Sequence, residues 1–239
     1  MPRFYVDAAL RAGSSVLLPE DSAHHAVHVL RVHGGDEITL FNGRGGEYAS
    51  RIASIQRLKV LVDVLTHHAV ERESPLRMVL VQGVSAGERM DFTVRKSVEL
   101  GVAEIQPLLA ASTVARPKGE RAAARHAHWQ KVAIAACEQC GRNQIPKVQP
   151  MIAAADYRGG EGTKILLSPR SELGFSQAVK RGGEAFTIAA GPEAGFNADE
   201  ERAFLDAGFV PARLGPRVLR TETAGLAALA ALSALAGDF

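Results

Sequence analysis

FTIAAGPEAGFN, residues 186–197, is an apolar strand that runs into a turn of glycine and proline and then into a helix. Asn197 and Glu200 have the spacing of a capping box, so we expect the helix to begin directly after Asn197. In an open α/β sheet, ligands bind beyond the carboxyl ends of the strands, where small residues let a ligand approach the backbone. The turn 191–196 is therefore either a pocket wall or a plain connection that needs glycine.

Similar units lie on both sides of this stretch. Hydrophobic periodicity predicts strands at 77–84, 104–109 and 164–167, and helices at 88–100, 121–140, 198–207 and 222–236. Alternation of this kind predicts an α/β domain with a largely parallel sheet.

The first part of the chain has a different rhythm. Short alternating runs at 14–18, 36–41, 47–55 and 57–66, with one brief helix starting near Asp21, predict a small β-barrel. The charged stretch ERESP, residues 71–75, ends in proline and is typical of a domain linker. We therefore expect two domains, 1–71 and 72–239.

The composition is that of a folded, soluble protein. Of the 239 residues, 46% are hydrophobic and 23% are charged, which are ordinary globular values. The N-terminus lacks the apolar core of a signal peptide, and the longest apolar stretch, 224–236, is too short to span a bilayer. We expect a cytoplasmic protein without a membrane partner.

Metal binding is not expected. Cys137 and Cys140 form one C-x-x-C pair without the second pair of a zinc site, so we expect two reduced thiols. His24, His25 and His28 have no acidic or cysteine ligand nearby in the sequence.

Basic residues are concentrated in one segment. The whole chain has a net charge of only +2, but residues 112–147 carry seven basic against two acidic side chains, a local excess of +5 that favours phosphate. Gln139, Arg142 and Asn143, at the end of a basic helix, have planar groups suited to base edges or phosphate. Gly141 also fits an ordinary helix end, and both interpretations can hold.

A second loop, LGPRVLRTETA at residues 214–224, enters a helix rich in alanine and leucine. Thr221 is a suitable N-cap, and Glu222 would favour the positive end of the helix. Arg217 and Arg220 at this end indicate a site that faces an anion.

The chain has neither a dinucleotide fingerprint nor a phosphate-binding P-loop, which disfavours a nucleotide-dependent oxidoreductase and a nucleotide hydrolase.

In several of these segments, the chain resembles the RsmE family, the 16S ribosomal RNA uridine-N3 methyltransferases of the SPOUT superfamily. The resemblance covers nearly the whole length. It rests on RFY at 3–5, the stretch 24–41, KSVELGV at 96–102, EQCGR at 138–142, GPEAG at 191–195 and LGPRVLRTETA at 214–224.

The resemblance implies an N-terminal PUA-like β-barrel followed by a SPOUT α/β domain with a C-terminal trefoil knot. It also implies S-adenosylmethionine as cofactor, a homodimer, and 16S ribosomal RNA or the small ribosomal subunit as partner. The family's cofactor loops map onto Leu167, Gly191, Pro192, Glu193, Gly195, Leu214, Gly215, Arg217 and Leu219. The family usually has glycine where this chain has Ala194, so a positive φ there would strain the loop.

Methylating N3 of uridine requires removal of a weakly acidic N–H while charge develops on the base oxygens. We expect Arg220 to stabilise that charge and Glu222 or Glu193 to take the proton. For RNA binding we expect Arg3, Arg31, Gln139 and Arg142 to contribute.

Alternatives stay open. A noncatalytic RNA-binding or ribosome-assembly protein would use the same basic surface, and a related methyltransferase could modify another RNA nucleotide. The helix 222–236 has small residues that permit close approach, so we expect it near a dimer interface; simple burial against its own sheet is the other interpretation.

Overall fold

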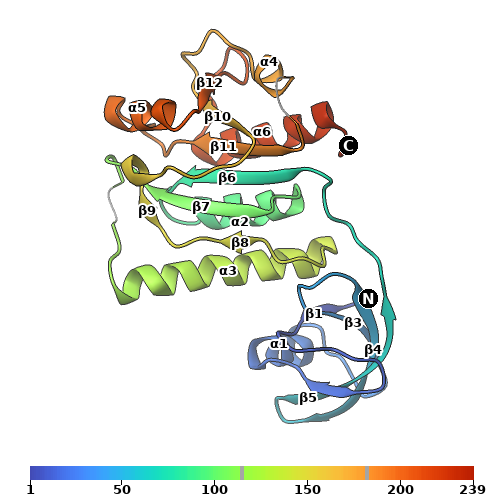
Figure 1. Ribbon diagram of the computed structural model, residues 1–239. Helices are drawn as coiled ribbons and strands as arrows, with labels where there is room; N and C mark the ends of the chain where they lie inside the picture. The colour runs from blue at the N-terminus through green and yellow to red at the C-terminus, as the bar shows by residue number, and fades with distance from the viewer. Residues whose placement is uncertain (114–115, 181–182) are drawn as a thin grey trace. The chain divides into compact units, whose positions relative to one another are not determined.

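The computed structural model describes residues 1–113, 116–180 and 183–239. The chain divides into two compact units, each with its own core. The first unit comprises Met1–Glu73 and Cys137–Ile145, and the second comprises Ser74–Ala136 and Pro146–Phe239. Both units are drawn in Figure 1. Residues 137–145 belong to the first unit, although the sequence on either side of them belongs to the second.

The first unit is a small β domain with one brief helical segment, as predicted. Its described strands pair in the order β1-β3-β4-β5-β2, with β1 and β3 parallel and the other neighbours antiparallel. The elements are β1 (Arg3–Tyr5), β2 (Ser15–Leu17), α1 (Glu20–His24), the π-helical turn η1 (His25–Val29), β3 (Glu37–Phe41), β4 (Glu47–Gln56) and β5 (Lys59–His68).

Alternating side chains build the core of this unit. Ile38 and Leu40 of β3 and Ile52 of β4 are almost completely buried, as are Val60 and Val62 of β5. Since side chains alternate between the faces of a strand, each strand needs only every second residue to be apolar. Two irregularities in the pairing of β4 with β5 interrupt the ladder, and such bulges increase the local twist of a sheet.

A buried ion pair fastens residues 137–145 to the rest of the first unit. Arg142 donates from Nε and Nη2 to Glu73 Oε2, at 2.8 and 2.6 Å. Their side chains are only 7% and 16% exposed. Asn143, also buried, donates from its side-chain amide to the Val70 carbonyl. These two contacts are with residues some 70 positions earlier in the chain.

The second unit is an α/β domain with a parallel sheet. Its described strands run in the order β12-β10-β11-β6-β7-β8, with β9 also paired to β7, and every pairing is parallel. The elements are β6 (Arg77–Gly83), α2 (Arg89–Glu99), β7 (Glu104–Leu109), α3 (Glu120–Cys140), β8 (Lys147–Val148), β9 (Ile152–Ala153), the 3-10 turn η2 (Ala154–Asp156), β10 (Thr163–Leu167), α4 (Phe175–Val179), β11 (Ala185–Ala190), α5 (Ala198–Asp206), β12 (Val210–Ala212) and α6 (Thr221–Ala236).

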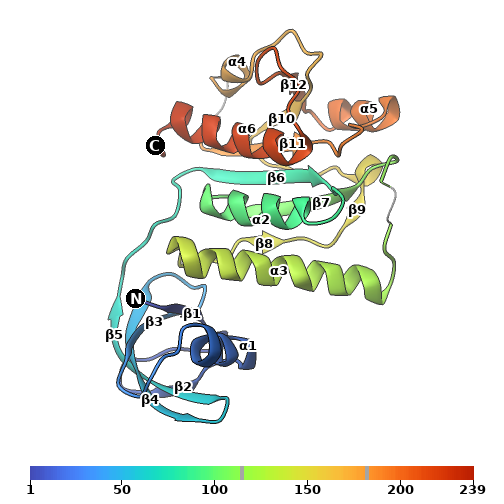
Figure 2. The ribbon, with the colours of Figure 1, turned by 180° about the vertical axis from the view of Figure 1, so that it is seen from behind.

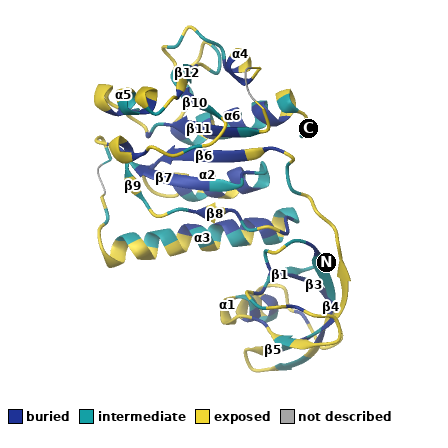
Figure 3. Ribbon diagram, viewed as in Figure 1, coloured by how far each residue is buried: buried dark blue, intermediate teal, exposed yellow. Residues whose placement is uncertain are grey.

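Helices cover both faces of this sheet. Figure 2 shows α2 and α6 side by side on one face, and α6 also contacts β6 and β11. Val79 and Val81 of β6 point to the opposite face, where they join a core cluster with Phe204 of α5. The central strands β6 and β11 are accordingly almost entirely buried (Figure 3). Continuous apolar runs are typical of such doubly covered strands.

The predicted start of α5 is confirmed. Asn197 is the N-cap, its side chain accepts from the Glu200 amide at 2.8 Å, and Glu200 accepts from the Asn197 amide at 2.9 Å. This capping box ends the loop that follows β11 and so limits where the Gly191–Gly195 turn can lie.

Replacing Arg142 with alanine should destabilise the first unit by about 3–5 kcal/mol, because the Glu73 carboxylate would be left buried without its cationic partner. Urea unfolding followed by circular dichroism measures the loss. Arg51→Ala is the matched control, since the Arg51–Glu37 pair of the same unit is exposed and such pairs contribute only about 0–1 kcal/mol. Equal effects of the two replacements would contradict a structural role for the Arg142–Glu73 pair.

Candidate functional site

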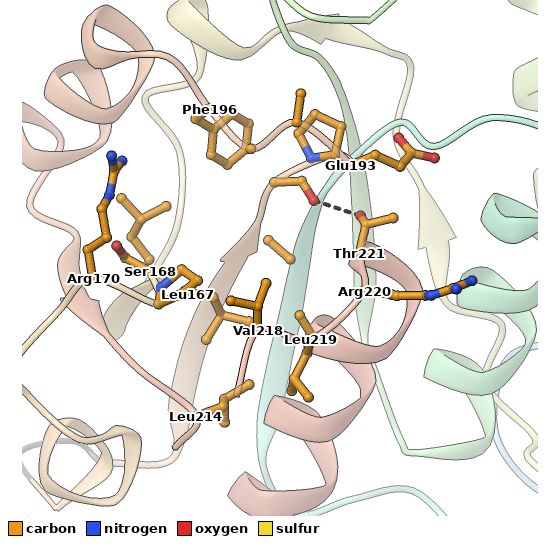
Figure 4. Close-up of a pocket in the computed structure, with 18 of the residues that line it drawn as sticks. Leu167, Ser168, Arg170, Glu193, Phe196, Leu214, Val218, Leu219, Arg220 and Thr221 are labelled. Atoms are coloured by element: carbon orange, nitrogen blue, oxygen red, sulfur yellow. Dashed lines mark hydrogen bonds between the residues drawn. The ribbon is translucent and has the colours of Figure 1, made fainter. Parts of the chain in front are cut away.

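Loops that follow parallel strands of the second unit enclose a cavity of about 800 Å³. Its walls come from the ends of β10, β11 and β12, the loops after them, and the first turn of α6 (Figure 4). Because these strands are parallel neighbours, their carboxyl ends meet at one edge of the sheet. The volume is within the range of small-molecule and cofactor pockets.

The structure brings the predicted cofactor residues together at this cavity. Every one of them lies in its wall, although they come from three separate stretches of sequence: Leu167, Gly191, Pro192, Glu193, Gly195, Leu214, Gly215, Arg217 and Leu219. The two predicted catalytic residues, Arg220 and Glu222, line the same cavity. The roles of these residues stay predictions.

Glycine occupies the left-handed backbone positions of the pocket loops. Gly195 has φ +73° and Gly215 has φ +105°, values that residues with a Cβ rarely adopt. Ala194 has no positive φ and is exposed. The left-handed position is therefore the glycine after Ala194, and the alanine does not strain the loop.

Glu193 is held by the loop that follows β6 and by the first residue of α2. Its Oε1 accepts from Arg89 Nη1 at 2.7 Å and from the Ala86 amide at 3.2 Å. Partial burial alone would raise the pKa of the Glu193 carboxyl, but its own amide, the Ala86 amide and Arg89 together lower it below the ordinary value. A carboxylate stabilised in this way is a poor proton acceptor, so the geometry favours Glu222 of the two predicted bases.

Thr221 has a different role from the N-cap that the sequence predicts. The N-cap of α6 is Arg220, and no side chain caps this helix. The Thr221 hydroxyl is buried and donates instead to the Gly191 carbonyl at 2.6 Å, while accepting from Gln82 Nε2 at 3.0 Å. Sequence reasoning missed Gln82, although a polar residue at the end of the apolar run MVLVQ was a usable signal.

Charged side chains surround the pocket next to this hydroxyl. Arg217 and Arg220 are exposed, and Glu222 is partly buried in the first turn of α6. In Figure 4 the side chain of Arg220 projects away from Leu214 and Leu167, on the side of the loops where Glu193 lies. A cation and a carboxylate thus lie in the wall of the cavity.

The four predicted RNA-binding residues fall into two pairs in the first unit. Arg31 and Gln139 are exposed, and Arg31 has the unusual φ of +54°. Arg3 is largely buried, pairs with Glu47, and donates to Asn143 Oδ1 at 2.8 Å. Arg142 is buried against Glu73 as described. The contacts of Arg3 and Arg142 favour a structural role, and RNA binding by either residue stays a prediction.

The basic segment before and within α3 is mostly at the surface of the second unit. Lys118 and Arg121 are exposed. Arg116 is exposed too, but its guanidinium donates to the carbonyls of Ala110 and Ala111 at 2.8 and 2.9 Å. Lys118 and Arg121 are therefore the side chains of this segment best placed to meet phosphate.

Both cysteines are free thiols. Burial raises the pKa of the Cys137 thiol to about 12, so Cys137 is protonated at neutral pH and is no nucleophile. Within the described residues, no three His, Cys, Asp or Glu side chains gather as metal ligands. No described helix has the length and apolarity needed to cross a membrane.

Two family models match the chain. Residues 72–233 match an RNA methyltransferase domain, and residues 18–65 match an RNA methyltransferase PUA domain. The ribosomal RNA small subunit methyltransferase E of Buchnera aphidicola (subspecies Acyrthosiphon pisum) is 34% identical over all of this chain and 95% of its own length. The protein of the same name from Bacillus subtilis is 28% identical over 98% of this chain and 96% of its own.

Solved structures agree with these relatives. A ribosomal RNA small subunit methyltransferase E from Neisseria gonorrhoeae, bound to S-adenosyl methionine, is 40% identical, with a TM-score of 0.91 over 100% of this chain and 99% of that one. A Legionella pneumophila structure with the bound cofactor SAM is 37% identical, with a TM-score of 0.94 over 99% and 98%. Matched over its whole length in sequence and in structure, the chain belongs to the ribosomal RNA small subunit methyltransferase E family.

Proposed function

We propose that the protein transfers a methyl group from S-adenosylmethionine to N3 of a uridine in 16S ribosomal RNA of the small ribosomal subunit. The observation that carries the proposal is the cavity of the second unit, in which all the predicted cofactor residues and both predicted catalytic residues meet. Membership of the family and the cofactor-bound relatives support the same reaction.

The pocket fits this cofactor chemically. Leu167, Leu214 and Leu219 supply apolar walls for a planar base. The backbone groups of the loops around Gly191 and Gly215 supply hydrogen-bond partners that need no side chain. When bound, S-adenosylmethionine supplies an electrophilic methyl group on a sulfonium sulfur.

The protein's own residues would prepare the uridine for transfer. Arg220 would stabilise negative charge on the base oxygens as the N3 proton leaves. Glu222, two residues after Arg220, would accept that proton. Glu193 would hold the loop in place through Arg89 and the Ala86 amide, since its carboxylate is already occupied.

RNA recognition would use both units. We assign a PUA-like RNA-binding domain to residues 1–71, with Arg31 and, from the end of α3, Gln139 as RNA contacts, and the methyltransferase domain to residues 72–239. The exposed Lys118 and Arg121 would bind phosphate. A ribosomal RNA substrate would place the protein in the cytoplasm.

The proposal also includes a homodimer and the C-terminal trefoil knot that the resemblance implies. The helix α6 contacts α2, β6 and β11, while Leu226, Ala227 and Ala230 are only partly buried. Small side chains on that side would let a second copy approach closely, which supports α6 as part of the interface.

Cells that lack this protein should lose one N3-methylated uridine in 16S ribosomal RNA, because the protein is the enzyme that we propose adds that methyl group. Mass spectrometric mapping of the RNA measures the change, and expression of the intact chain should restore it. An unchanged set of methylated uridines, or loss of a methyl group from another nucleotide or from ribose, would contradict the proposed specificity.

Replacing Arg220 with alanine should lower kcat by roughly 10²–10³-fold, since one preorganised charge-stabilising group contributes about that much. The Kd for S-adenosylmethionine, measured by calorimetry, should change little. Arg217→Ala is the matched comparison in the same loop, and it should instead weaken cofactor binding. Equal losses of methyl transfer and of cofactor affinity in the Arg220 variant would exclude its proposed role.

RNA affinity should fall steeply as salt is raised, because phosphate contacts release counterions. Replacing both Lys118 and Arg121 with alanine should reduce the salt slope by about 1–2 and weaken binding to any RNA sequence. Fluorescence anisotropy over a salt series measures both. The control removes two charges, Lys180 and Arg213, near β12 at the opposite edge of the sheet. A slope that is the same in both variants would argue against α3 as a phosphate-binding surface.

A further inference from the structure

A chain of buried hydrogen bonds joins three elements beneath the pocket. Gln82 is at the end of β6, Thr221 begins α6, and Gly191 follows β11. Gln82 Nε2 donates to Thr221 Oγ1 at 3.0 Å, and Thr221 Oγ1 donates to the Gly191 carbonyl at 2.6 Å. Gln82 is completely buried and Thr221 is 6% exposed. Figure 4 shows the bond from Thr221 to the loop.

The direction of these bonds is fixed by the number of hydrogens. The Thr221 hydroxyl has one proton, and a carbonyl can only accept, so the proton goes to Gly191. The hydroxyl must then accept from Gln82, whose other amide hydrogen goes to the Gly83 carbonyl at 3.1 Å. Gln82 Oε1 has no hydrogen-bond partner among the described residues.

Two glycines bring the same elements into close contact. A Cβ on Gly83 would lie 2.4 Å from the Pro192 nitrogen and 2.9 Å from the Gly191 carbonyl carbon. A Cβ on Gly225, in the second turn of α6, would lie 3.0 Å from Gln82 Oε1. The end of β6 therefore contacts both the Gly191–Pro192 peptide and α6 directly, which leaves little freedom for any of the three to shift.

We propose that Thr221, supported by Gln82, is a positioning residue that holds the Gly191 loop and the start of α6 in one arrangement before the cofactor binds. This inference rests on the proposed function. The Thr221 side chain donates a hydrogen bond to the Gly191 carbonyl, in the loop that would hold the cofactor. In the sequence, Thr221 lies directly between Arg220 and Glu222. One hydroxyl thereby fixes the loop that would hold the methyl donor relative to the two groups that would act on the uridine.

Thr221→Val tests the proposal, because it keeps the shape of the side chain and removes both hydrogen bonds. We expect the Kd for S-adenosylmethionine to rise roughly tenfold, about the effect of losing a buried hydrogen bond. In the cofactor-free protein, the Gly195 amide, which donates to the Pro192 carbonyl at 2.8 Å, should exchange its hydrogen faster. Thr221→Ser keeps the hydroxyl and should restore both measurements.

Thr187→Val is the matched control. Thr187 is buried in β11, and its hydroxyl donates to the Glu161 carbonyl at 3.1 Å, away from the residues that line the pocket. The same chemical change there should leave the cofactor Kd and the exchange of Gly195 as in the wild type. Gln82→Met is a second variant that preserves size and removes the donor to Thr221, so it should also accelerate exchange in the loop.

The outcomes separate the two proposals. If the wild-type protein binds S-adenosylmethionine and the Thr221→Val and Gln82→Met variants match it in Kd and in Gly195 exchange, the positioning role is wrong and the proposed function stands. The positioning role is also wrong if Thr187→Val weakens cofactor binding as much as Thr221→Val does. If the wild-type protein does not bind the cofactor, both proposals are overturned.

Discussion

The parallel pairing of β6, β11, β10 and β12 is the constraint on which the pocket depends. Because the four strands run in one direction, their carboxyl ends meet at one edge of the sheet, and the loops that follow β10, β11 and β12 share one cavity. Parallel neighbours require long crossovers, so residues that meet at this edge are distant in the chain. Gln82 and Thr221, which share a hydrogen bond, are 139 positions apart.

The longer elements were predictable because their hydrophobic periods extend over enough residues to be distinctive. The pattern predicts β7 at its observed bounds and places α3 and α6 within one residue of their observed starts. The strands β1, β8, β9 and β12 were missed, since two or three residues rarely show a period; of the strands this short, only β2 was predicted. Membership of residues 137–145 in the first unit was also missed, because it depends on distant partners such as Glu73.

The location of the site was more predictable than the contacts within it. Glycine, proline and arginine are concentrated in two short stretches, so local sequence was enough to mark the loops. The partners of individual side chains come from elsewhere in the fold. The sequence predicts Thr221 as an N-cap because threonine before an apolar helix often is one. In the structure its hydroxyl instead forms hydrogen bonds with Gln82 and Gly191.

Charged residues of the same type have different roles, depending on whether the protein itself supplies their partner. Where the protein supplies both members of a pair, as with Arg142 and Glu73 or with Arg89 and Glu193, each charge is compensated before any ligand arrives, and the pair holds structure. None of the ion pairs found among the described residues involves Arg220 or Glu222. A cation or a carboxylate that has no ion-pair partner in the protein interacts most strongly with opposite charge that develops on a bound substrate. Our proposal that these two residues carry the chemistry rests on their position in the wall of the cavity.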